Sequence, residues 1–188
     1  MKVSQQIVGV NQRLGNTAVP NMQGTTRVIF DTNNVTSLGT DNTLTFFSGV
    51  SSRVYPLANI STNRFEVGES LAIQGFSLQS YTTATPTLTT VMNAGMADYK
   101  CGILNFYIGN QRVIKDLEIA VYSRFNLGET VSEATLSTIF RLETPIVIPP
   151  QIEFYATLRF GTATAFNGVS VVLAAFGTGT LLNTKSNF

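Results

Sequence analysis

The sequence offers few side chains that could carry out enzyme chemistry. It contains no histidine and a single cysteine, Cys101. Neither a Ser-His-Asp nor a Cys-His arrangement can therefore be formed within the chain, and its lysines lack the S-x-x-K spacing of Ser–Lys catalysis. The usual transition-metal ligand sets are missing for the same reason. We therefore predict a protein that is not an enzyme, with no metal site and no cofactor.

Two pairs of acidic residues remain as candidates for glycoside hydrolysis, which needs two carboxyl groups flanking the bond that is cut. They are Glu66 with Glu69, and Glu118 with Glu153. Such enzymes usually add tryptophan side chains that hold sugars, and this sequence contains no tryptophan. Surface carboxylates without a catalytic role are therefore the favoured interpretation.

Two further motifs have only a superficial likeness to ligand sites. Asp31-Thr32-Asn33-Asn34 begins like a calcium loop, but Thr36 and Asn42 occupy the positions of the required glycine and bidentate glutamate. A turn is the favoured interpretation of this run. Gly177-Thr178-Gly179-Thr180 is not followed by the Gly-Lys-Ser/Thr of a phosphate-binding loop.

The composition indicates an all-β protein. Hydrophobic residues make up 44% of the chain and charged residues 12%; Thr, Phe, Tyr and Val fit pleated strands, whereas Asn, Gly and Ser fit turns. The formal net charge of +1, without a clustered basic segment, argues against tight or sequence-specific binding of nucleic acid. So few charges also predict that much of the surface contacts other subunits.

No targeting or membrane segment is predicted. The N-terminus has no apolar stretch or cleavage pattern after Lys2 that would indicate a signal peptide. The longest apolar run, Val169–Phe176, is far shorter than the roughly 20 residues that span a bilayer. We expect a chain made in the cytoplasm without a transmembrane segment, and contact with an internal membrane is left open.

Several segments read as strands. Thr26–Phe30 is a short run closed by the turn that begins at Asp31, and Leu44–Val50 is a second candidate. In Leu71–Tyr81 the apolar residues change parity at Gly75, as a β-bulge would produce. Val169–Phe176 is apolar on both faces and ends at Gly177, which indicates a central strand covered on two sides.

The second half of the chain contains the clearest local patterns. Residues 102–124 read as a hairpin, with Gly109-Asn110 as a two-residue turn in which both residues tolerate positive φ. Residues 130–142 fit a short helix that leads into a strand. Five apolar residues then alternate strictly and are expected to line the core: Ile152, Phe154, Ala156, Leu158 and Phe160.

These elements predict an antiparallel β-sandwich, a jelly roll of about eight strands with at most one or two short helices. We expect an extended N-terminal arm (1–25), one jelly-roll β domain (26–180) and a C-terminal tail (181–188). The terminal segments contain hydrophobic residues without a period, so a partner subunit is their expected cover. The predicted interface residues are Val3, Ile7, Val8, Val10, Leu14, Leu181, Leu182 and Phe188.

Three stretches together resemble viral jelly-roll capsid proteins, especially those of tailless icosahedral bacteriophages. They are PLANISTNRFEVGESLAIQGFSL (56–78), LNFYIGNQRVIKDLEI (104–119) and ETPIVIPPQIEFYATLRF (143–160). The resemblance implies a structural virion protein that assembles with copies of itself or with other capsid proteins, and it brings no catalytic residues. Major coat, penton and minor capsid roles all stay open.

A second function class shares the β-sandwich. A carbohydrate-binding module of a phage tail or cell-surface adhesin would have the same architecture, and it would normally present aromatic platforms or calcium ligands. A hit on a glycan array would favour that module, whereas a discrete closed oligomer would favour the capsid subunit.

Overall fold

A computed structural model of the chain describes residues 22–34, 42–49, 53, 55–81, 102–119, 139–160 and 170–182. For residues 22, 23, 80, 181 and 182 it describes the backbone alone. Within these ranges the structure is built of strands and the loops between them, and no helix reaches a full turn.

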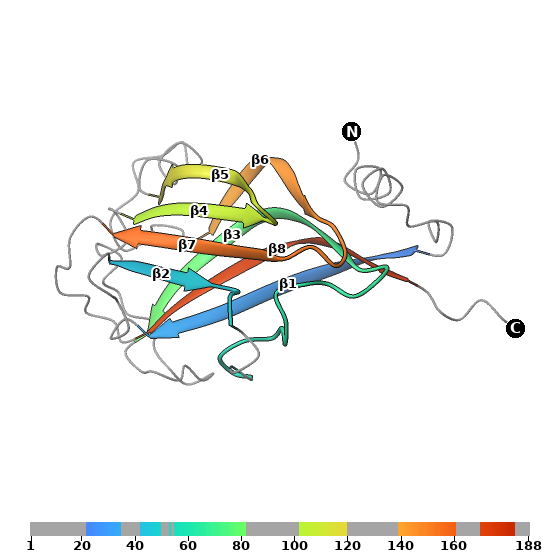
Figure 1. Cartoon of the computed structure of the whole chain (residues 1–188), viewed down its shortest axis with the longest axis horizontal. Helices are drawn as coiled ribbons and strands as arrows, with labels where there is room; N and C mark the ends of the chain where they lie inside the picture. Colours follow the sequence, from blue (N-terminus) through green and yellow to red (C-terminus); the bar gives the residue numbers. More distant parts are fainter. Residues whose placement is uncertain are drawn as a thin grey trace, which may run out of the picture.

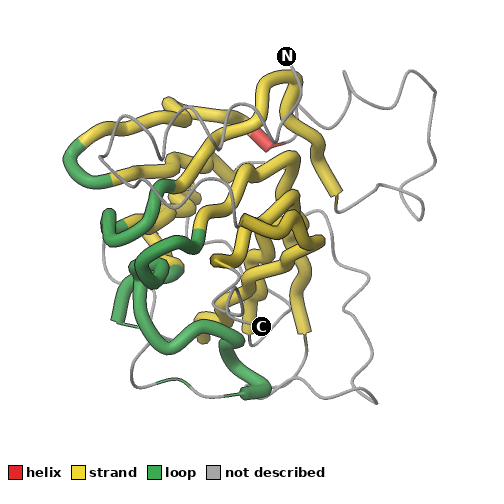
Figure 2. Tube along the Cα trace, turned by 90° about the vertical axis from the view of Figure 1, so that its right-hand side faces the viewer, coloured by secondary structure: helices red, strands yellow, loops and turns green. Residues whose placement is uncertain are grey.

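Eight strands form two four-stranded antiparallel sheets, which lie one in front of the other in Figure 1 and are turned by 90° in Figure 2. Successive strands alternate between the two sheets, except for β4 and β5, which form a hairpin within one sheet. This is the jelly roll that the sequence predicts. One sheet has the order β1 (Met22–Asn34), β8 (Ser170–Leu182), β3 (Ser70–Tyr81), β6 (Ile139–Ile148), and the other β2 (Thr43–Phe46), β7 (Phe154–Phe160), β4 (Gly102–Ile108), β5 (Gln111–Glu118).

Strand β7 shows how the alternating pattern builds the core. Phe154, Ala156, Leu158 and Phe160 are buried between the sheets, as predicted from their spacing. Ile152 is half-buried and lies in the loop before the strand, so the prediction that it lines the core is wrong. The chain turns at Gln151, whose φ is 59°, and the strand begins only after that turn.

The core between the sheets is rich in phenylalanine. Phe154 packs against Phe65, Phe47 and Phe106, with ring centroids 5.1, 5.7 and 6.3 Å apart. Phe76 continues the cluster toward Phe106 and Phe140. Such ring pairs stabilise a core by about 0.5–1.5 kcal/mol each beyond the area they bury. The fully buried large side chains come from both sheets: Phe46, Phe47, Phe76, Phe106, Phe154, Ile29, Leu71, Ile73, Leu104, Ile148 and Leu158.

Two local predictions are confirmed in β3 and in the β4–β5 hairpin. The pairing of β3 with β6 and with β8 shifts between Ile73 and Gly75, which is the predicted bulge. The hairpin turns at Gly109-Asn110 and pairs Ile108 with Gln111. Gly109 has φ of 56°, whereas Asn110 does not have positive φ, so only the first turn residue adopts this conformation.

Other predictions need correction because the strands are paired beyond their apolar residues. Strand β1 continues through Asp31–Asn34, which was expected to be a turn. It pairs with β8 along their whole lengths, from Asn34 opposite Ser170 to Met22 opposite Leu182. The strand therefore begins inside the expected arm (1–25), and β8 ends inside the expected tail (181–188), having passed through Gly177. In contrast, β2 ends at Phe46, because Phe47 adopts φ of 65°.

Several predictions lie outside the described residues. These are the arm up to residue 21, the short helix at 130–138, the far end of the 102–124 hairpin, and the tail from residue 183. The strand ends that flank the gaps after β1, β3, β5 and β7 all lie at one end of the sandwich. The connections β2–β3, β4–β5 and β6–β7 lie at the other end, and these are the ones the structure describes most fully.

Candidate functional site

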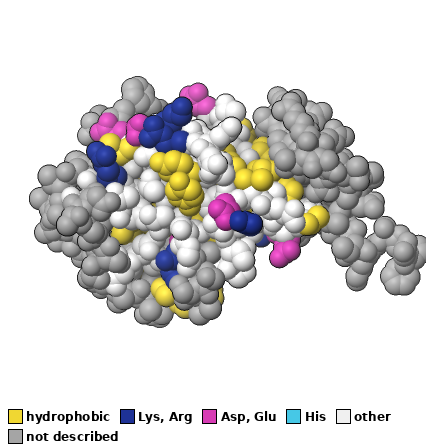
Figure 3. Space-filling model, in the orientation of Figure 1, with side chains coloured by type: hydrophobic (Ala, Val, Ile, Leu, Met, Phe, Trp, Pro, Cys, Tyr) yellow, Lys and Arg dark blue, Asp and Glu magenta, His cyan; other side chains and the backbone are white. Residues whose placement is uncertain are grey.

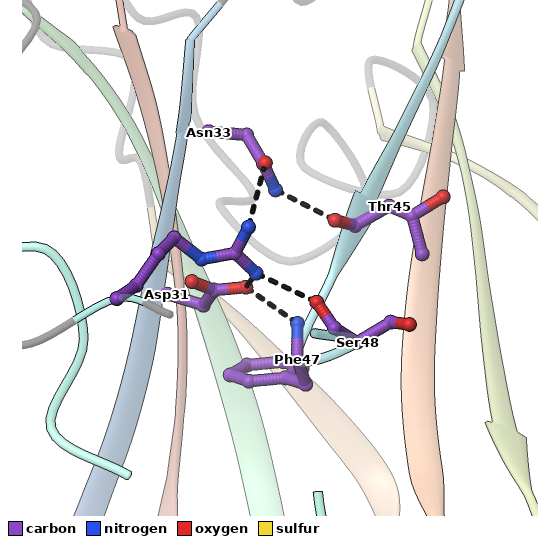
Figure 4. A network of polar contacts seen from close by, with 6 residues as sticks. Asp31, Asn33, Thr45, Phe47 and Ser48 are labelled. Atoms are coloured by element: carbon purple, nitrogen blue, oxygen red, sulfur yellow. Dashed lines mark hydrogen bonds and ion pairs between the residues drawn. The ribbon is translucent and has the colours of Figure 1, made fainter. Parts of the chain in front are cut away.

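A network of short hydrogen bonds around Asp31 of β1 joins the two sheets (Figure 4). Asp31 Oδ2 accepts hydrogen bonds from the Phe47 N–H at 2.6 Å and from the Arg53 guanidinium at 2.7 Å. Arg53 also donates to the Ser48 carbonyl at 2.8 Å. Beside it, Asn33 Nδ2 donates to the Thr45 carbonyl of β2 at 2.6 Å. The network fixes the start of the β2–β3 loop against β1.

Asp31 is unsuited to catalysis despite its unusual environment. Burial raises the pKa of its carboxyl above the ordinary value of 3.8, and the hydrogen bond from Phe47 and the charge of Arg53 offset this only in part. A raised pKa and a charged partner are common in active sites. Asp31 is, however, fully buried, so a substrate cannot reach its carboxyl group. Its contribution is to position the β2–β3 loop.

The free edge of β1 is covered by the same loop. Asn59 donates from Nδ2 to the Val28 carbonyl at 2.7 Å, and its Oδ1 accepts from the Phe30 N–H at 2.8 Å. Ala58 forms a bridge with Asp31. The Asn59 side chain thus takes the place of a neighbouring strand, which protects an edge that could otherwise pair with another chain.

The three described connections are bonded to one another at their end of the sandwich. Gly109 of the hairpin turn donates to the Glu153 carbonyl at 2.7 Å, and Phe154 donates to the Asn63 carbonyl at 3.0 Å. The Glu153 carboxylate forms an exposed ion pair with Arg64. These contacts make the end rigid, but they leave no carboxylate pair directed at a common ligand.

The structure does not support the two acidic pairs as glycosidase sites. Glu118 is the last residue of β5, whereas Glu153 lies beside the turn at the start of that strand. The eight residues of β5 separate them by roughly 20 Å, well beyond the 6.5–9.5 Å or so of an inverting pair. Glu69 is paired with Arg27 at 2.9 Å, and Glu66 lies in the turn before it. One acid of each pair is therefore bound to an arginine: Glu69 to Arg27 and Glu153 to Arg64.

Within the described ranges, no three acidic or cysteine side chains gather closely enough to hold a metal ion. Across the same residues, no helix is both long and apolar enough to cross a membrane.

The outer faces of the two sheets differ in chemistry. On the β2-β7-β4-β5 sheet, Tyr107 and Tyr155 stack with ring centroids 4.4 Å apart and planes at 6°. Arg112 lies opposite Tyr107 and bonds weakly to Asn105 and Asp116, both at 3.4 Å. Figure 3 views the molecule from the side on which β7 and β4 lie in front, and shows a small hydrophobic cluster among polar and charged side chains.

The outer face of the β1-β8-β3-β6 sheet is apolar across its middle. Its outward side chains include Val28 and Ile139, which are 47% and 48% exposed. Phe30, Ala174 and Phe176 lie between them and are half-buried. We call these five residues, with Val172, the apolar face. The pattern of Val28 and Phe30 along the chain does not indicate this face, because it becomes visible only when their strand is paired with β8.

The structure brings together none of the predicted interface residues in a described contact. Leu181 and Leu182 belong to β8, where their backbones pair with Gln23 and Met22. Val3, Ile7, Val8, Val10, Leu14 and Phe188 lie outside the described residues.

Comparisons with known proteins give little beyond this geometry. No protein-family model matches the chain, and no curated protein matches it. Among solved structures, the chain is similar to the major capsid protein P2 from Bacteriophage PM2, with a TM-score of 0.41 and 9% sequence identity. The match covers 90% of this chain and 48% of that protein, so the chain spans about half of its length.

Proposed function

We propose that this chain is a structural subunit of an icosahedral capsid, which assembles with copies of itself or packs with other capsid proteins and catalyses no reaction. The observation that carries the proposal is an exposed apolar face on a jelly roll whose core is already filled. Jelly rolls build viral capsid domains and lectin domains among others, so the fold alone does not decide the function. An exposed apolar face, however, is typical of a surface that contacts other proteins.

Two features of the described residues support this proposal. The buried acid, Asp31, is held by Arg53 and serves to join the sheets, and Glu69 and Glu153 are bound to arginines. The three stretches that resemble phage capsid proteins also fold as β3, as the β4–β5 hairpin, and as the end of β6 followed by β7, with the loops beside them. The polar groups thus maintain the scaffold, and contacts with other subunits are left to its surfaces.

The proposal includes the terminal segments. We assign Val3, Ile7, Val8, Val10 and Leu14 of the arm, with Leu181, Leu182 and Phe188 of the tail, to contacts with neighbouring subunits. The place of action is the virion, after synthesis in the host cytoplasm. Sequence-specific binding of nucleic acid forms no part of the role, and contact with an internal membrane is left open.

The test is the solution mass of the purified full-length chain. Multi-angle light scattering and negative-stain electron microscopy should show a discrete closed oligomer or a particle that grows with protein concentration. A monodisperse monomer at every concentration, alone and mixed with the other proteins of its virion, would contradict the proposal.

A carbohydrate-binding module is the second candidate, and the stacked Tyr107–Tyr155 pair favours it. The pair lies on an outer sheet face beside Arg112, so it offers ring surface and hydrogen-bond donors to one ligand. A glycan array should then give hits that disappear in Tyr155→Ala and persist in Val113→Ala, a change elsewhere on the same sheet. An array without hits would remove this candidate and leave the capsid proposal untouched.

A further inference from the structure

The apolar face has a regular layout across all four strands of its sheet. The strand register places Phe30, Ala174, Ser77 and Ile139 in one row and Val28, Phe176, Gly75 and Arg141 in the next. Side chains on either side of these positions, such as Ile29 and Ala175, point into the core. Arg141 is the one charged side chain in the two rows, and it lies on the edge strand β6.

Polar side chains border this apolar centre at both ends. At one end Gln74 donates to Thr178 Oγ1 at 3.2 Å, and Thr26 lies opposite Thr178. At the other end Tyr81 donates to Gln79 Oε1 at 2.7 Å. An apolar centre within a polar rim is the usual anatomy of a protein–protein interface. A sheet face that water covers would instead carry polar residues throughout.

The centre of the face is also flat. The ring of Phe176 lies across Gly75, where an added Cβ would come within 2.5 Å of Phe176 Cζ. Glycine therefore lets the ring lie down on the neighbouring strand instead of projecting from the sheet. Ala174 and Ser77, beside it, are small. A flat surface of this kind packs well against a second sheet at the usual spacing of about 10 Å.

The outer face of the whole sheet, its apolar centre and polar rim together, is large enough for a stable interface. Strands of 13, 13, 12 and 10 residues, spaced about 4.8 Å apart with a rise of about 3.3 Å per residue, give a face of roughly 760 Å². A standard interface buries about 800 Å² on each partner. Two copies of this sheet, packed face to face, would therefore bury as much surface as a specific complex needs.

We propose that the apolar face packs against the same face of a second copy of this chain, in a two-fold symmetric, sheet-on-sheet interface. The inference rests on the proposed function and names the surface through which subunits meet. Identical faces suit each other here because the rows contain no acidic residue and one basic residue, so two copies bring few like charges together. Arg141 on the edge strand stays at the rim, where water still reaches its guanidinium.

The experiment compares full-length variants that place one carboxylate on either sheet. Val28→Glu and Ile139→Glu change the apolar face, whereas Val113→Glu alters a valine of similar exposure, 40%, on β5 of the other sheet. We expect each face variant to weaken self-association by about 30-fold or more, because the new carboxylate would be buried without a partner in the apolar contact. Val113→Glu should associate like the wild type. Sedimentation velocity measures the association, and the thermal midpoint confirms that each variant is folded.

The occupant of the face is identified by a photo-crosslinking residue at position 28, with equal amounts of ¹⁴N- and ¹⁵N-labelled protein. The proposal expects mixed-isotope crosslinks to β1, β8, β3 or β6. Crosslinks to residues 1–21 would overturn it in favour of the arm as the occupant. Face variants that assemble like the wild type would also overturn it while the proposed function stands. A wild-type chain that never associates would overturn both.

Discussion

Asp31 and Arg53 are joined at 2.7 Å across 22 residues of sequence, and the carboxylate is fully buried while the guanidinium is partly exposed. The carboxylate also accepts a hydrogen bond from the Phe47 N–H in the loop after β2. One buried acid therefore connects β1, in one sheet, to the chain leaving the other. Its second oxygen, Oδ1, has no hydrogen-bond partner among the described residues.

Replacing Asp31 by asparagine should change the free energy of unfolding at pH 7 by less than about 1 kcal/mol. Asparagine keeps an oxygen for the Phe47 N–H, its amide nitrogen takes the position of the unpartnered Oδ1, and the burial cost of the charge disappears. Asp31→Ala removes both acceptor contacts and should cost about 3 kcal/mol. Urea denaturation measures both variants, and equal losses in the two would show that the charge itself matters.

The same pair predicts the pH dependence of stability. Because burial raises the pKa of Asp31 above 3.8, its stabilising contribution is fully present below pH 3.8 and is lost as the pH rises through the raised value. The free energy of unfolding of the wild type, minus that of Asp31→Asn, should therefore fall with pH in this window and then stay level. A difference that grows as the pH rises would mean that Arg53 lowers the pKa instead.

The segment that begins at Asp31 shows which features could not be predicted from the sequence. The run Asp31-Thr32-Asn33-Asn34 has turn residues, and a turn was expected. The partner that makes a strand stable there, Arg53, lies 22 positions away, and no local pattern connects the two. The extension of β8 through Gly177 and Gly179 was not predicted for a related reason. Thr and Gly residues show no apolar alternation there, and the strand is formed by its pairing with β1.

Patterns that depend on neighbouring residues were predicted well. The alternation from Phe154 to Phe160, the bulge at Gly75 and the turn at Gly109 all arise within a few residues of sequence. The two-sheet architecture followed from these elements. The apolar face could not be found in this way, because Val28, Phe176 and Ile139 come onto one surface only when four distant strands pair.

The hairpin turn gives a direct test of local backbone strain. Gly109 has φ of 56°, and an added Cβ would meet Ile152 Cγ2 at an ordinary 3.6 Å. The cost of Gly109→Val therefore comes from the backbone and should exceed about 1 kcal/mol. Gly24→Val is the matched control, since nothing lies within 4 Å of its Cβ and valine suits a strand. Similar melting temperatures for the two variants would contradict this account.

The phenylalanine core gives a larger effect. Phe154 is fully buried and contacts the rings of Phe47, Phe65 and Phe106. Phe154→Ala should lower the free energy of unfolding by about 3–5 kcal/mol, through lost burial and the cavity left behind. Ile152→Ala, at the half-buried position just before the strand, should cost clearly less. Chemical denaturation of both variants decides whether the core begins at Phe154, and equal losses would place Ile152 in it.

The last prediction separates folding from assembly. The described sheets begin at Met22, so deletion of residues 1–14 removes no described strand. The truncated chain should keep the β-type circular dichroism spectrum and the melting temperature of the full chain, and Phe154→Ala serves as the contrasting variant in which the fold itself is weakened. Assembly beyond the dimer should be lost, because Val3, Ile7, Val8, Val10 and Leu14 are proposed to contact neighbouring subunits.

Light scattering of the truncated chain decides between two kinds of contact. If the same oligomer or particle still forms, the arm is not an assembly element and the sheet faces together with the loops hold the subunits. If the truncated chain stops at a dimer that Val28→Glu then dissociates, the apolar face joins two copies and the arm links these pairs into a larger shell. A closed shell needs a second kind of contact besides the apolar face, because a two-fold interface by itself ends at the dimer.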